Sequence, residues 1–244
     1  KLSLNTLTIG YEGNYYSYKN EVDYASRVSN YISSNHFEKY LKSDDLINFL
    51  PKMIQLQDEP IADPVCMPVY YVSKLAVDNG MKVCQVGEGA DELFAGYPFW
   101  LKLLSIQKFV NLFVPNIIIR LVLKILRKLN LDLNWKYEYL YRCSKGLPVF
   151  WGGAEAFTHR QKIFLLSPRM KEIYKNKTSW DSILPFWNRY KKASNKYDYL
   201  DWMSYLDLNF RLPELLLMRV DKMSMGTSLE TRVPFLDHKF VEYA

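Results

Sequence analysis

The amino-acid sequence predicts an α/β fold, with a parallel sheet and flanking helices in its first part and a mainly α-helical C-terminal part. Strand and helix patterns alternate as far as Gly96, which is typical of a parallel sheet covered by helices. Beyond that point the strand patterns fade, and long helical segments rich in aromatic residues and lysine follow. Because 49% of the 244 residues are hydrophobic and 16% are aromatic, the chain can bury a sizeable core, which excludes a disordered or fibrous protein.

A strand–helix–strand pattern comes first. Residues 4–10 (LNTLTIG) alternate and end in glycine, as a strand does. Residues 21–34 carry apolar side chains near helical spacing, which predicts a helix. Residues 36–41 form a short strand candidate.

Two helices and a strand are expected next. Ser43 is a suitable N-cap for a helix over 44–57, whose acidic first turn suits the positive end of the helix dipole. A helix over 67–79 should stop at Gly80, and residues 82–86 (KVCQV) form a compact apolar strand. We expect 82–86 to lie in one parallel sheet with the first strand, because ligand sites form outside the carboxyl ends of such strands.

The helical part contains the most apolar stretch of the chain, residues 109–129. Polar and basic residues interrupt it, whereas a membrane span needs about 20 mostly apolar residues. We therefore expect two amphipathic helices broken at Pro115, and we expect membrane contact to be absent. A basic amphipathic helix lying on a membrane is the alternative. Ser167 and Pro168 mark a further helix start, and 237–244 read as helical.

Charge, cysteines and histidines exclude several classes of function. The net charge is +6, from 32 Lys and Arg against 26 Asp and Glu, but the basic residues are spread along the chain, which argues against nucleic-acid binding. The three cysteines are far apart, as in a cytoplasmic protein with reduced thiols. The three scattered histidines argue against a zinc site.

The loop at residues 86–97 (VGEGADELFAGY) is the best candidate for chemistry. It follows an expected strand and places three glycines around three carboxylates: Gly87, Gly89 and Gly96, with Glu88, Asp91 and Glu92. Glycines let backbone N–H groups approach an anion, and clustered carboxylates need a cation or a polyphosphate-bound metal to neutralise them. The alternative is a turn whose acidic residues cap the next helix.

Two further segments are unusual in composition. Residues 58–68 (DEPIADPVCMP) are acidic and rich in proline, and residues 219–237 (RVDKMSMGTSLETRVPFLD) combine basic and acidic side chains. Taken singly, they are also compatible with a capped loop and with a helix followed by a packed turn.

Together the three segments resemble, in order and spacing, the synthetase domain of glutamine-hydrolysing asparagine synthetase. Members of that family carry a DEP segment, an S-G-(E/D)-G-x-D-E-x-F-x-G-Y loop and a V-D-(K/R)-x-S-M…E-x-R-V-P-F-L-D block. The resemblance covers nearly the whole chain. It implies the adenine nucleotide alpha hydrolase-like fold of the ATP pyrophosphatases, with 1–100 as its α/β nucleotide-binding part and 101–244 as the helical part of the same domain.

The resemblance also implies an activity. The family uses ATP and Mg²⁺ to activate aspartate as an acyl-adenylate with release of pyrophosphate, and ammonia derived from glutamine then displaces AMP. A glutaminase domain is accordingly expected upstream or in trans, together with small-molecule substrates, a cytoplasmic location and a homodimer. Two alternatives are a paralogue that amidates another carboxylate, in a surface glycan or peptide, and a non-catalytic nucleotide-binding or interaction module.

Site residues follow from the same resemblance. Ile9, Val86 and Gly87 match positions that bind ATP, and Asp91 matches a magnesium ligand. Glu88 matches the catalytic residue beside the acyl-adenylate, where a carboxylate can orient or deprotonate the incoming amine.

Three more positions are weaker matches. Asp63 is the main polar side chain in the segment expected to bind the acceptor, and Lys222 is a candidate for the charge of phosphate or substrate. Arg232 is expected to hold its loop through Glu230 or Asp237.

The chain departs from the family pattern in two ways. Val86 stands where relatives carry Ser, which leaves only backbone contacts to the nucleotide at that position. The family's SGGLDS pyrophosphate loop, expected before the first strand, and a lysine-bearing segment expected after Ala244 do not occur in these residues, so both ends look truncated and the chain alone is expected to be inactive.

Overall fold

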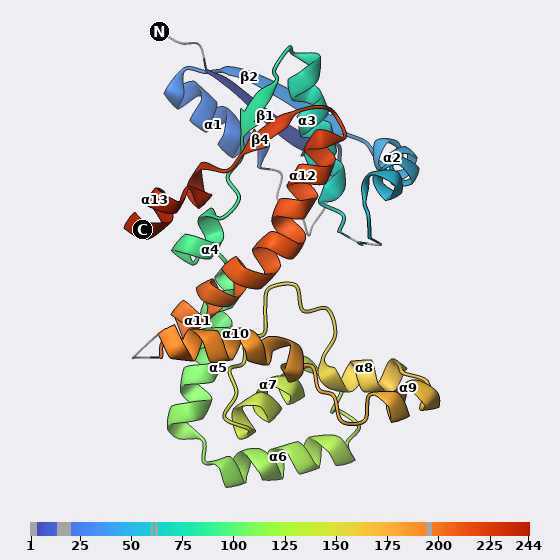
Figure 1. The fold of residues 1–244 in the computed structure, drawn as a ribbon, viewed down its shortest axis with the longest axis vertical. Coiled ribbons are helices and arrows are strands. Elements are labelled where there is room, and N and C mark those ends of the chain that lie inside the picture. Colours follow the sequence, from blue (N-terminus) through green and yellow to red (C-terminus); the bar gives the residue numbers. More distant parts are fainter. Residues whose placement is uncertain (1–3, 14–20, 60, 62, 194–196) are drawn as a thin grey trace. The chain divides into compact units, whose positions relative to one another are not determined.

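The computed structural model describes residues 4–13, 21–59, 61, 63–193 and 197–244. Its contacts divide the chain into two compact units: unit 1 contains residues 1–88 and 215–243, and unit 2 contains residues 89–214. Short parallel sheets with helices make up unit 1, and unit 2 is helical (Figure 1). The predicted α/β fold with a helical part is confirmed. The functional boundary expected at residue 100 stays a prediction.

Unit 1 contains two parallel strand pairs. Strand β1 (Asn5–Tyr11) pairs with β2 (Asn35–Leu41) in register from their first residues to their last. Strand β3 (Val83–Gln85) pairs with β4 (Glu230–Arg232), which comes from the far end of the sequence. The predicted strands at 4–10, 36–41 and 82–86 are therefore present.

The prediction that the first and third of these strands lie in one sheet is wrong for the described residues. Strand β1 is hydrogen-bonded only to β2, and β3 only to β4. A groove of about 630 Å³, lined by residues of β1, α3 and β3, lies between the two pairs. Neighbouring strands must approach to about 4.8 Å to pair. The groove keeps β1 and β3 too far apart for that.

Six helices of the described residues belong to unit 1. They are α1 (Val22–Ile32), α2 (Ser43–Leu56), α3 (Cys66–Asp78), α12 (Met218–Met225), the 3-10 helix η2 (Pro234–Leu236) and α13 (His238–Tyr243). Three of them, α1, α3 and α12, pack against the strands of this unit. A buried cluster joins α2, α3 and α12, and its members are Phe49, Met53, Cys66, Tyr70 and Met223.

The predicted N-cap of α2 is wrong by one residue. Ser43 is the first helical residue, and Lys42 occupies the cap position. The backbone N–H of Lys42 donates to Oδ2 of Asp45 at 2.9 Å, so an acidic side chain in the first turn bonds back to the cap residue.

Unit 2 consists of helices connected by loops. They are α4 (Ala90–Phe94), α5 (Pro98–Phe113), α6 (Asn116–Lys128), α7 (Trp135–Ser144), α8 (His159–Leu165), α9 (Pro168–Ile173), α10 (Trp180–Ala193), α11 (Tyr199–Leu206) and most of the π-helix η1 (Asp207–Leu217), whose residues 215–217 belong to unit 1. The predicted break at Pro115 is confirmed, and so is the predicted start of α9, where Oγ of Ser167 accepts from the backbone N–H of Met170 at 3.3 Å.

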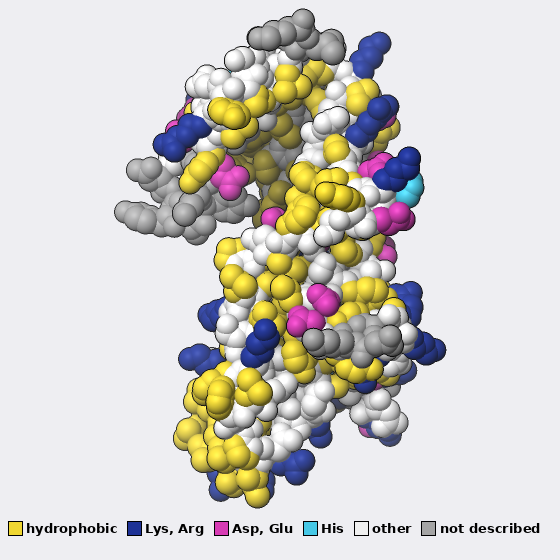
Figure 2. Space-filling model, turned by 90° about the vertical axis from the view of Figure 1, so that its left-hand side faces the viewer, with side chains coloured by type: hydrophobic (Ala, Val, Ile, Leu, Met, Phe, Trp, Pro, Cys, Tyr) yellow, Lys and Arg dark blue, Asp and Glu magenta, His cyan; other side chains and the backbone are white. Residues whose placement is uncertain are grey.

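Aromatic residues form much of the interior of unit 2. The first buried cluster consists of Trp100, Phe150, Trp151, Ile183, Tyr190, Trp202, Met203 and Leu206. The second lies around α5, α6 and α7 and contains Val110, Ile119, Leu123, Tyr137, Cys143 and Val149. Other hydrophobic side chains lie on the surface, where they gather in the lower part of Figure 2.

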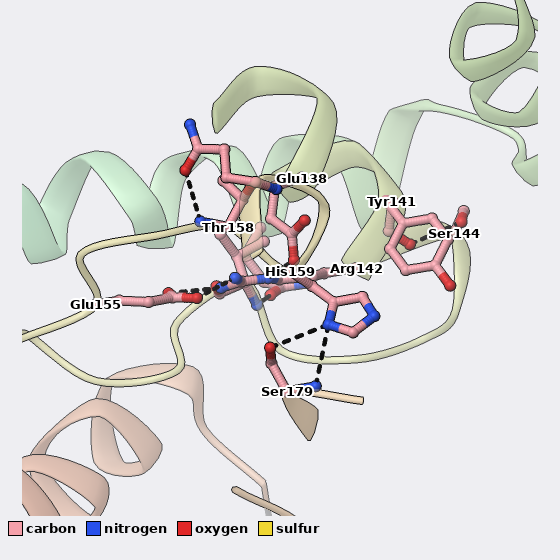
Figure 3. A network of polar contacts seen from close by, with 11 residues as sticks. Glu138, Tyr141, Arg142, Ser144, Glu155, Thr158, His159 and Ser179 are labelled. Carbon is pink, nitrogen blue, oxygen red and sulfur yellow. Dashed lines mark hydrogen bonds and ion pairs between the residues drawn. The ribbon is translucent and has the colours of Figure 1, made fainter. Parts of the chain in front are cut away.

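A buried ion-pair network holds the loop between α7 and α8 (Figure 3). Nε of Arg142 donates to Oε1 of Glu138 at 3.1 Å, and Nη1 donates to Oε2 of Glu155 at 2.9 Å and to the Val149 carbonyl at 2.6 Å. Arg142 also lies 3.7 Å from the Trp151 ring centre. Burial raises the pKa of Glu155 in spite of this arginine. Because Arg142 and Glu138 are fully buried and Glu155 is partly buried, the network rigidifies the loop only as a complete set.

Candidate functional site

The candidate site in unit 1 is built around Arg219, in the first turn of α12. Its Nη1 donates to Oδ2 of Asp63 at 2.8 Å, and its Nη2 donates to Oε1 of Glu88 at 3.2 Å. All three side chains are largely buried. One arginine therefore joins the three segments, 58–68, 86–97 and 219–237, that stand out in the sequence.

Local structure determines where the two carboxylates lie. Oδ1 of Asp63 accepts from the backbone N–H of Val65 at 3.0 Å, so Asp63 turns the chain into α3. The backbone N–H of Val86 donates to the Arg232 carbonyl at 2.9 Å, which continues the β3–β4 pairing one residue beyond β3. Glu88 follows two residues later, so its carboxylate is positioned by the sheet.

Charge compensation at Arg219 is strong. Burial acts to lower the pKa of Arg219, but the hydrogen bonds and charges of Asp63 and Glu88 outweigh it, and the pKa lies above its ordinary value. Charge-assisted hydrogen bonds of this kind are stronger than neutral ones. The Nε of Arg219 is buried and has no hydrogen-bond partner among the described residues. The cluster thus combines two carboxylates, one guanidinium and one unused donor.

The glycines of the loop have different surroundings. Gly87 is exposed, and a Cβ added there would contact nothing within 4 Å. At Gly96 an added Cβ would lie 2.0 Å from Oδ1 of Asp91, so glycine is needed for that close packing. Gly87 is therefore free of a packing requirement, whereas Gly96 is structural.

Asp91 and Glu92 belong to α4 in unit 2 and differ from each other. Asp91 is exposed in the first turn. Glu92 is buried, accepts from the Tyr97 hydroxyl at 2.5 Å and lies 3.9 Å from Nη1 of Arg211. Burial and the bond to Glu92 raise the pKa of Tyr97. Glu92 is thus a structural group, and Asp91 is the acidic side chain of α4 that solvent reaches.

A shared cation for the three loop carboxylates was one expectation from the sequence. In the described ranges, no three His, Cys, Asp or Glu side chains form a group that could hold a metal ion. Glu88 and Glu92 instead lie beside different arginines. The exposed carboxylate of Asp91 still fits Mg²⁺, because this ion commonly takes one or two protein carboxylates and completes its shell with water and substrate phosphates.

The weaker matches have partners of their own. Nζ of Lys222 donates to Oδ2 of Asp58, and both side chains are partly or fully exposed. This bond raises the pKa of Lys222. Nε of Arg232 donates to Oε1 of Glu230 at 2.8 Å on the surface, which confirms the first of the two expected partners.

The two other nucleotide matches lie on different strands. Ile9 is a half-buried residue of β1, where it pairs with Lys39 of β2. Val86 lines the groove between the strand pairs, while Ile9 is absent from the described residues that line it.

Sequence reasoning missed Arg219. The residue lies inside a segment that the sequence analysis singled out, but its two partners are 131 and 156 positions away. The acidic character of segments 58–68 and 86–97 was the feature that could have indicated it, because clustered carboxylates need a cation nearby in the fold.

Comparisons with known proteins agree with the motif segments. A sequence-family model described as asparagine synthase matches residues 1–244. Asparagine synthetase [glutamine-hydrolyzing] 1 of Bacillus subtilis is 30% identical over 235 residues, which are 96% of this chain and 35% of that protein. Asparagine synthetase [glutamine-hydrolyzing] 3 of the same organism is 24% identical over 251 residues, with 34% of that protein covered. The chain thus spans about a third of the length of these curated relatives.

Proposed function

Because this chain belongs to the asparagine synthase family, we propose that it forms the synthetase part of an ATP-dependent amide ligase. The observation that carries the proposal is Arg219, which joins the three motif segments through Asp63 and Glu88. A positioned carboxylate next to a buried cation, after a strand of a parallel sheet, supports an activation and transfer reaction at this end of the sheet.

The proposed reaction has two steps. A carboxylate oxygen of aspartate attacks the α-phosphorus of ATP, the bond to the β-phosphate oxygen breaks, and pyrophosphate leaves. Ammonia derived from glutamine then attacks the acyl carbon, the bond to AMP breaks, and the nitrogen loses a proton. The amide, AMP and pyrophosphate are the products.

Glu88 has the central role in the second step. Its carboxylate is the proton acceptor for the attacking amine, and such a positioned group typically contributes about a hundredfold or more to the rate. Arg219 is a positioning residue, because its hydrogen bond fixes one oxygen of Glu88 and leaves the carboxylate in one orientation. The unpaired Nε of Arg219 is a further donor for a substrate oxygen.

The nucleotide is expected to lie along the backbone that follows β3. Gly87 offers an unobstructed approach, and Val86 contributes backbone groups in place of the family's serine hydroxyl. Ile9 is proposed to contact the adenine and Lys222 to meet negative charge on phosphate or substrate. Asp91 would hold Mg²⁺, which supplies neutralisation of the pyrophosphate charge when it is bound.

The groove between β1 and β3 has a place in this proposal. Both strands have a neighbour on one edge only in the described residues, and the groove is lined by both. A further parallel strand seated there would join the two pairs into one sheet. The family resemblance implies an SGGLDS loop ahead of the first strand, so a strand carrying that loop is the proposed occupant.

Partners and location follow from the relatives' names. Both relatives named above are described as glutamine-hydrolysing, so we propose a glutaminase domain upstream or in trans as the ammonia source. A cytoplasmic location and a homodimer are further parts of the proposal.

A different acceptor is the second candidate. Both oxygens of Asp63 are already engaged, one by Arg219 and the other by the backbone of Val65. Asp63 is therefore committed to the fold in this arrangement rather than free to recognise the ammonium group of aspartate. This favours testing carboxylates of a glycan or peptide beside aspartate.

The experiment separates the two half-reactions in the full-length protein. ATP–pyrophosphate exchange reports activation, and amide formation reports the complete reaction. Asp91→Asn should abolish exchange while adenosine without metal still binds, because the lost charge matters where pyrophosphate charge develops. Glu88→Gln should reduce amide formation by about a hundredfold and affect exchange much less, because it retains the shape but cannot take the proton.

Asp201→Asn, an exposed substitution on α11, is the matched control and should leave both rates unchanged. Aspartate and other carboxylates are compared as acceptors in the unmodified protein. If neither Glu88→Gln nor Asp91→Asn changes either rate by more than about twofold, the loop is structural and the ligase proposal fails.

A further inference from the structure

The helices α5 and α6 carry an unusual distribution of charge. Residues 98–131 contain six basic side chains and no acidic one. The basic residues are Lys102, Lys108, Arg120, Lys124, Arg127 and Lys128, and all of them are exposed. This short region therefore carries a charge equal to the net +6 of the whole chain.

The same region exposes large apolar side chains. Only part of α6 faces the interior, where Ile119 and Leu123 are buried against α5 and α7. The exposed members are Phe109, Leu112 and Phe113 at the end of α5, and Ile117, Ile118, Leu121, Ile125, Leu129 and Leu131 on and after α6. We call these nine residues the apolar strip. Clusters of exposed apolar side chains mark interaction surfaces.

The helical periodicity of α6 places its exposed apolar residues on one side of the helix. Ile117, Leu121 and Ile125 recur every fourth position and so lie along one side of the helix, while Arg120 and Lys124 lie beside them. Figure 2 shows hydrophobic side chains gathered in its lower part, with Lys and Arg next to them. An apolar stripe flanked by basic residues is the pattern of a helix that lies in a membrane interface.

The lengths of the helices and the bend between them favour a position on the membrane surface over a position across the membrane. In the part of the chain that the structure describes, no single helix is long and apolar enough to cross a membrane. Residues 90–113 and α6 are long and apolar enough only when taken together, and the chain bends by 119° between them. The bend places the end of α5 and the length of α6 at one corner of unit 2 (Figure 1).

We propose that the apolar strip docks on the surface of an anionic lipid bilayer. The apolar side chains enter the interface, and the six basic side chains meet the anionic headgroups. Charge decides between this occupant and a second copy of the chain, because a symmetric dimer through this face would bring two sets of six positive charges together. The expectation of no membrane contact was based on the interrupted apolar pattern of residues 109–129. That pattern does not show which apolar side chains are exposed, and in the structure nine large ones are.

The test measures binding of the full-length protein to vesicles by co-sedimentation. Vesicles of phosphatidylcholine alone are compared with vesicles containing roughly one-third phosphatidylglycerol, which imitate an anionic surface. We expect binding to the anionic vesicles, weakened by added salt, and little binding to the neutral ones. This outcome does not depend on the ligase proposal, because no nucleotide or acceptor is present.

Matched variants identify the surface. Ile117 and Ile125 on α6 are 70% and 57% exposed, and Ile54 on α2 and Ile173 on α9 are 68% and 58% exposed. The double variant Ile117→Asn/Ile125→Asn should lower vesicle affinity by about tenfold or more. The control Ile54→Asn/Ile173→Asn, with equal exposure and the same substitution, should bind as the unmodified protein does.

A charge variant completes the test. Arg120→Gln/Lys124→Gln should also weaken binding to anionic vesicles by about tenfold or more, since each basic residue near the surface contributes to it. The proposal is overturned if the protein ignores anionic vesicles, or if both isoleucine pairs behave alike. It is also overturned if the protein without lipid is a dimer that only Ile117→Asn/Ile125→Asn dissociates in analytical ultracentrifugation, because a second copy then covers the strip.

Discussion

At the scale of single residues, Arg219 shows how one cation can organise several segments. Its guanidinium bonds two carboxylates from separate loops and is itself largely buried. Removing one partner of such a buried set leaves an uncompensated charge, which is strongly destabilising. The buried Nε without a partner in the described residues costs about 1–3 kcal/mol unless a water or substrate oxygen meets it. Arg219 therefore stabilises both loops and also keeps one donor, its Nε, available for a ligand oxygen.

Gly87 allows a test of the nucleotide position that leaves the fold unchanged. A Cβ at this residue contacts nothing within 4 Å, so Gly87→Ala should alter the free energy of unfolding by less than about 0.5 kcal/mol. The added methyl group would stand between the backbone and a bound phosphate or ribose, so ATP affinity of the full-length protein should fall clearly. Thermal unfolding and calorimetric ATP titration measure the two effects.

Gly153→Ala is the reverse control. Its Cβ would lie 2.7 Å from Nη1 of Arg211 and 2.8 Å from Oδ2 of Asp207, two buried or nearly buried groups that pair with each other. We expect a loss of roughly 1–3 kcal/mol in stability from this overpacking, with ATP affinity of the remaining folded protein unchanged. Unchanged ATP binding by Gly87→Ala would remove Gly87 from the nucleotide site.

At the scale of elements, the π-helix η1 begins at a buried acid. Asp207 accepts from the backbone N–H of Gly153 at 2.9 Å and from Nη1 of Arg211 at 3.4 Å. Burial is the main cause that raises the pKa of Asp207 to about 6, against the lowering influence of these two partners. π-Helical turns are rare and often lie at functional or strained positions.

The raised pKa predicts a specific pH dependence of stability. Between its ordinary pKa of 3.8 and about 6, Asp207 holds a proton in the folded protein that the unfolded chain has lost. Stability should therefore fall as the pH rises through this window and stay level above it, with a total contribution on the order of 3 kcal/mol. Asp207→Asn should remove that slope in urea unfolding measured from pH 4 to pH 7.

Exposed Asp201→Asn on α11 is the control and should keep the slope of the unmodified protein. Parallel curves for Asp207→Asn and the unmodified protein would contradict the raised pKa. The comparison uses the difference between variants, so other titrating groups cancel as long as the fold is the same.

Elements with a strong local signal were predictable from the sequence. The break at Pro115 and the start at Ser167 and Pro168 depend on residues whose backbone preferences are local. Strand β4 was not predicted, because its three residues become a strand only by pairing with β3. The start of η1 depends on Asp207 and Gly153, which are 54 positions apart, so no local pattern indicates it.

The candidate site, too, was only partly predictable from the sequence. Motif resemblance identified Glu88 and Asp63 as functional candidates, since their segments have recognisable spacing. It did not reveal that Asp63 is already bound to Arg219, or that Glu92 is buried beside Tyr97. Those facts depend on which distant segments the fold brings together.

At the scale of the whole molecule, the charge is unevenly distributed. Outside residues 98–131 the basic residues number 32 − 6 = 26, equal to the 26 acidic residues of the chain. The rest of the chain is therefore neutral in sum, and the region of the apolar strip carries a local excess of six positive charges. A local excess attracts an anionic surface within about a Debye length, roughly 8–10 Å at physiological salt.

The last prediction concerns the groove between β1 and β3 and compares two lengths of the protein. The 244 residues alone should show little ATP–pyrophosphate exchange, whereas a protein extended by an SGGLDS-bearing segment ahead of β1 should show it clearly. The added strand would occupy the groove and place its loop at the carboxyl ends of the strands. Loss of even one positioned donor for a developing anion costs on the order of a hundredfold in rate. A cooperative unfolding transition of the shorter protein must accompany the assay, since an unfolded chain would be inactive for a trivial reason. Brisk exchange by the folded 244-residue protein would show that these residues bind pyrophosphate without a further strand, and the groove would then need another occupant.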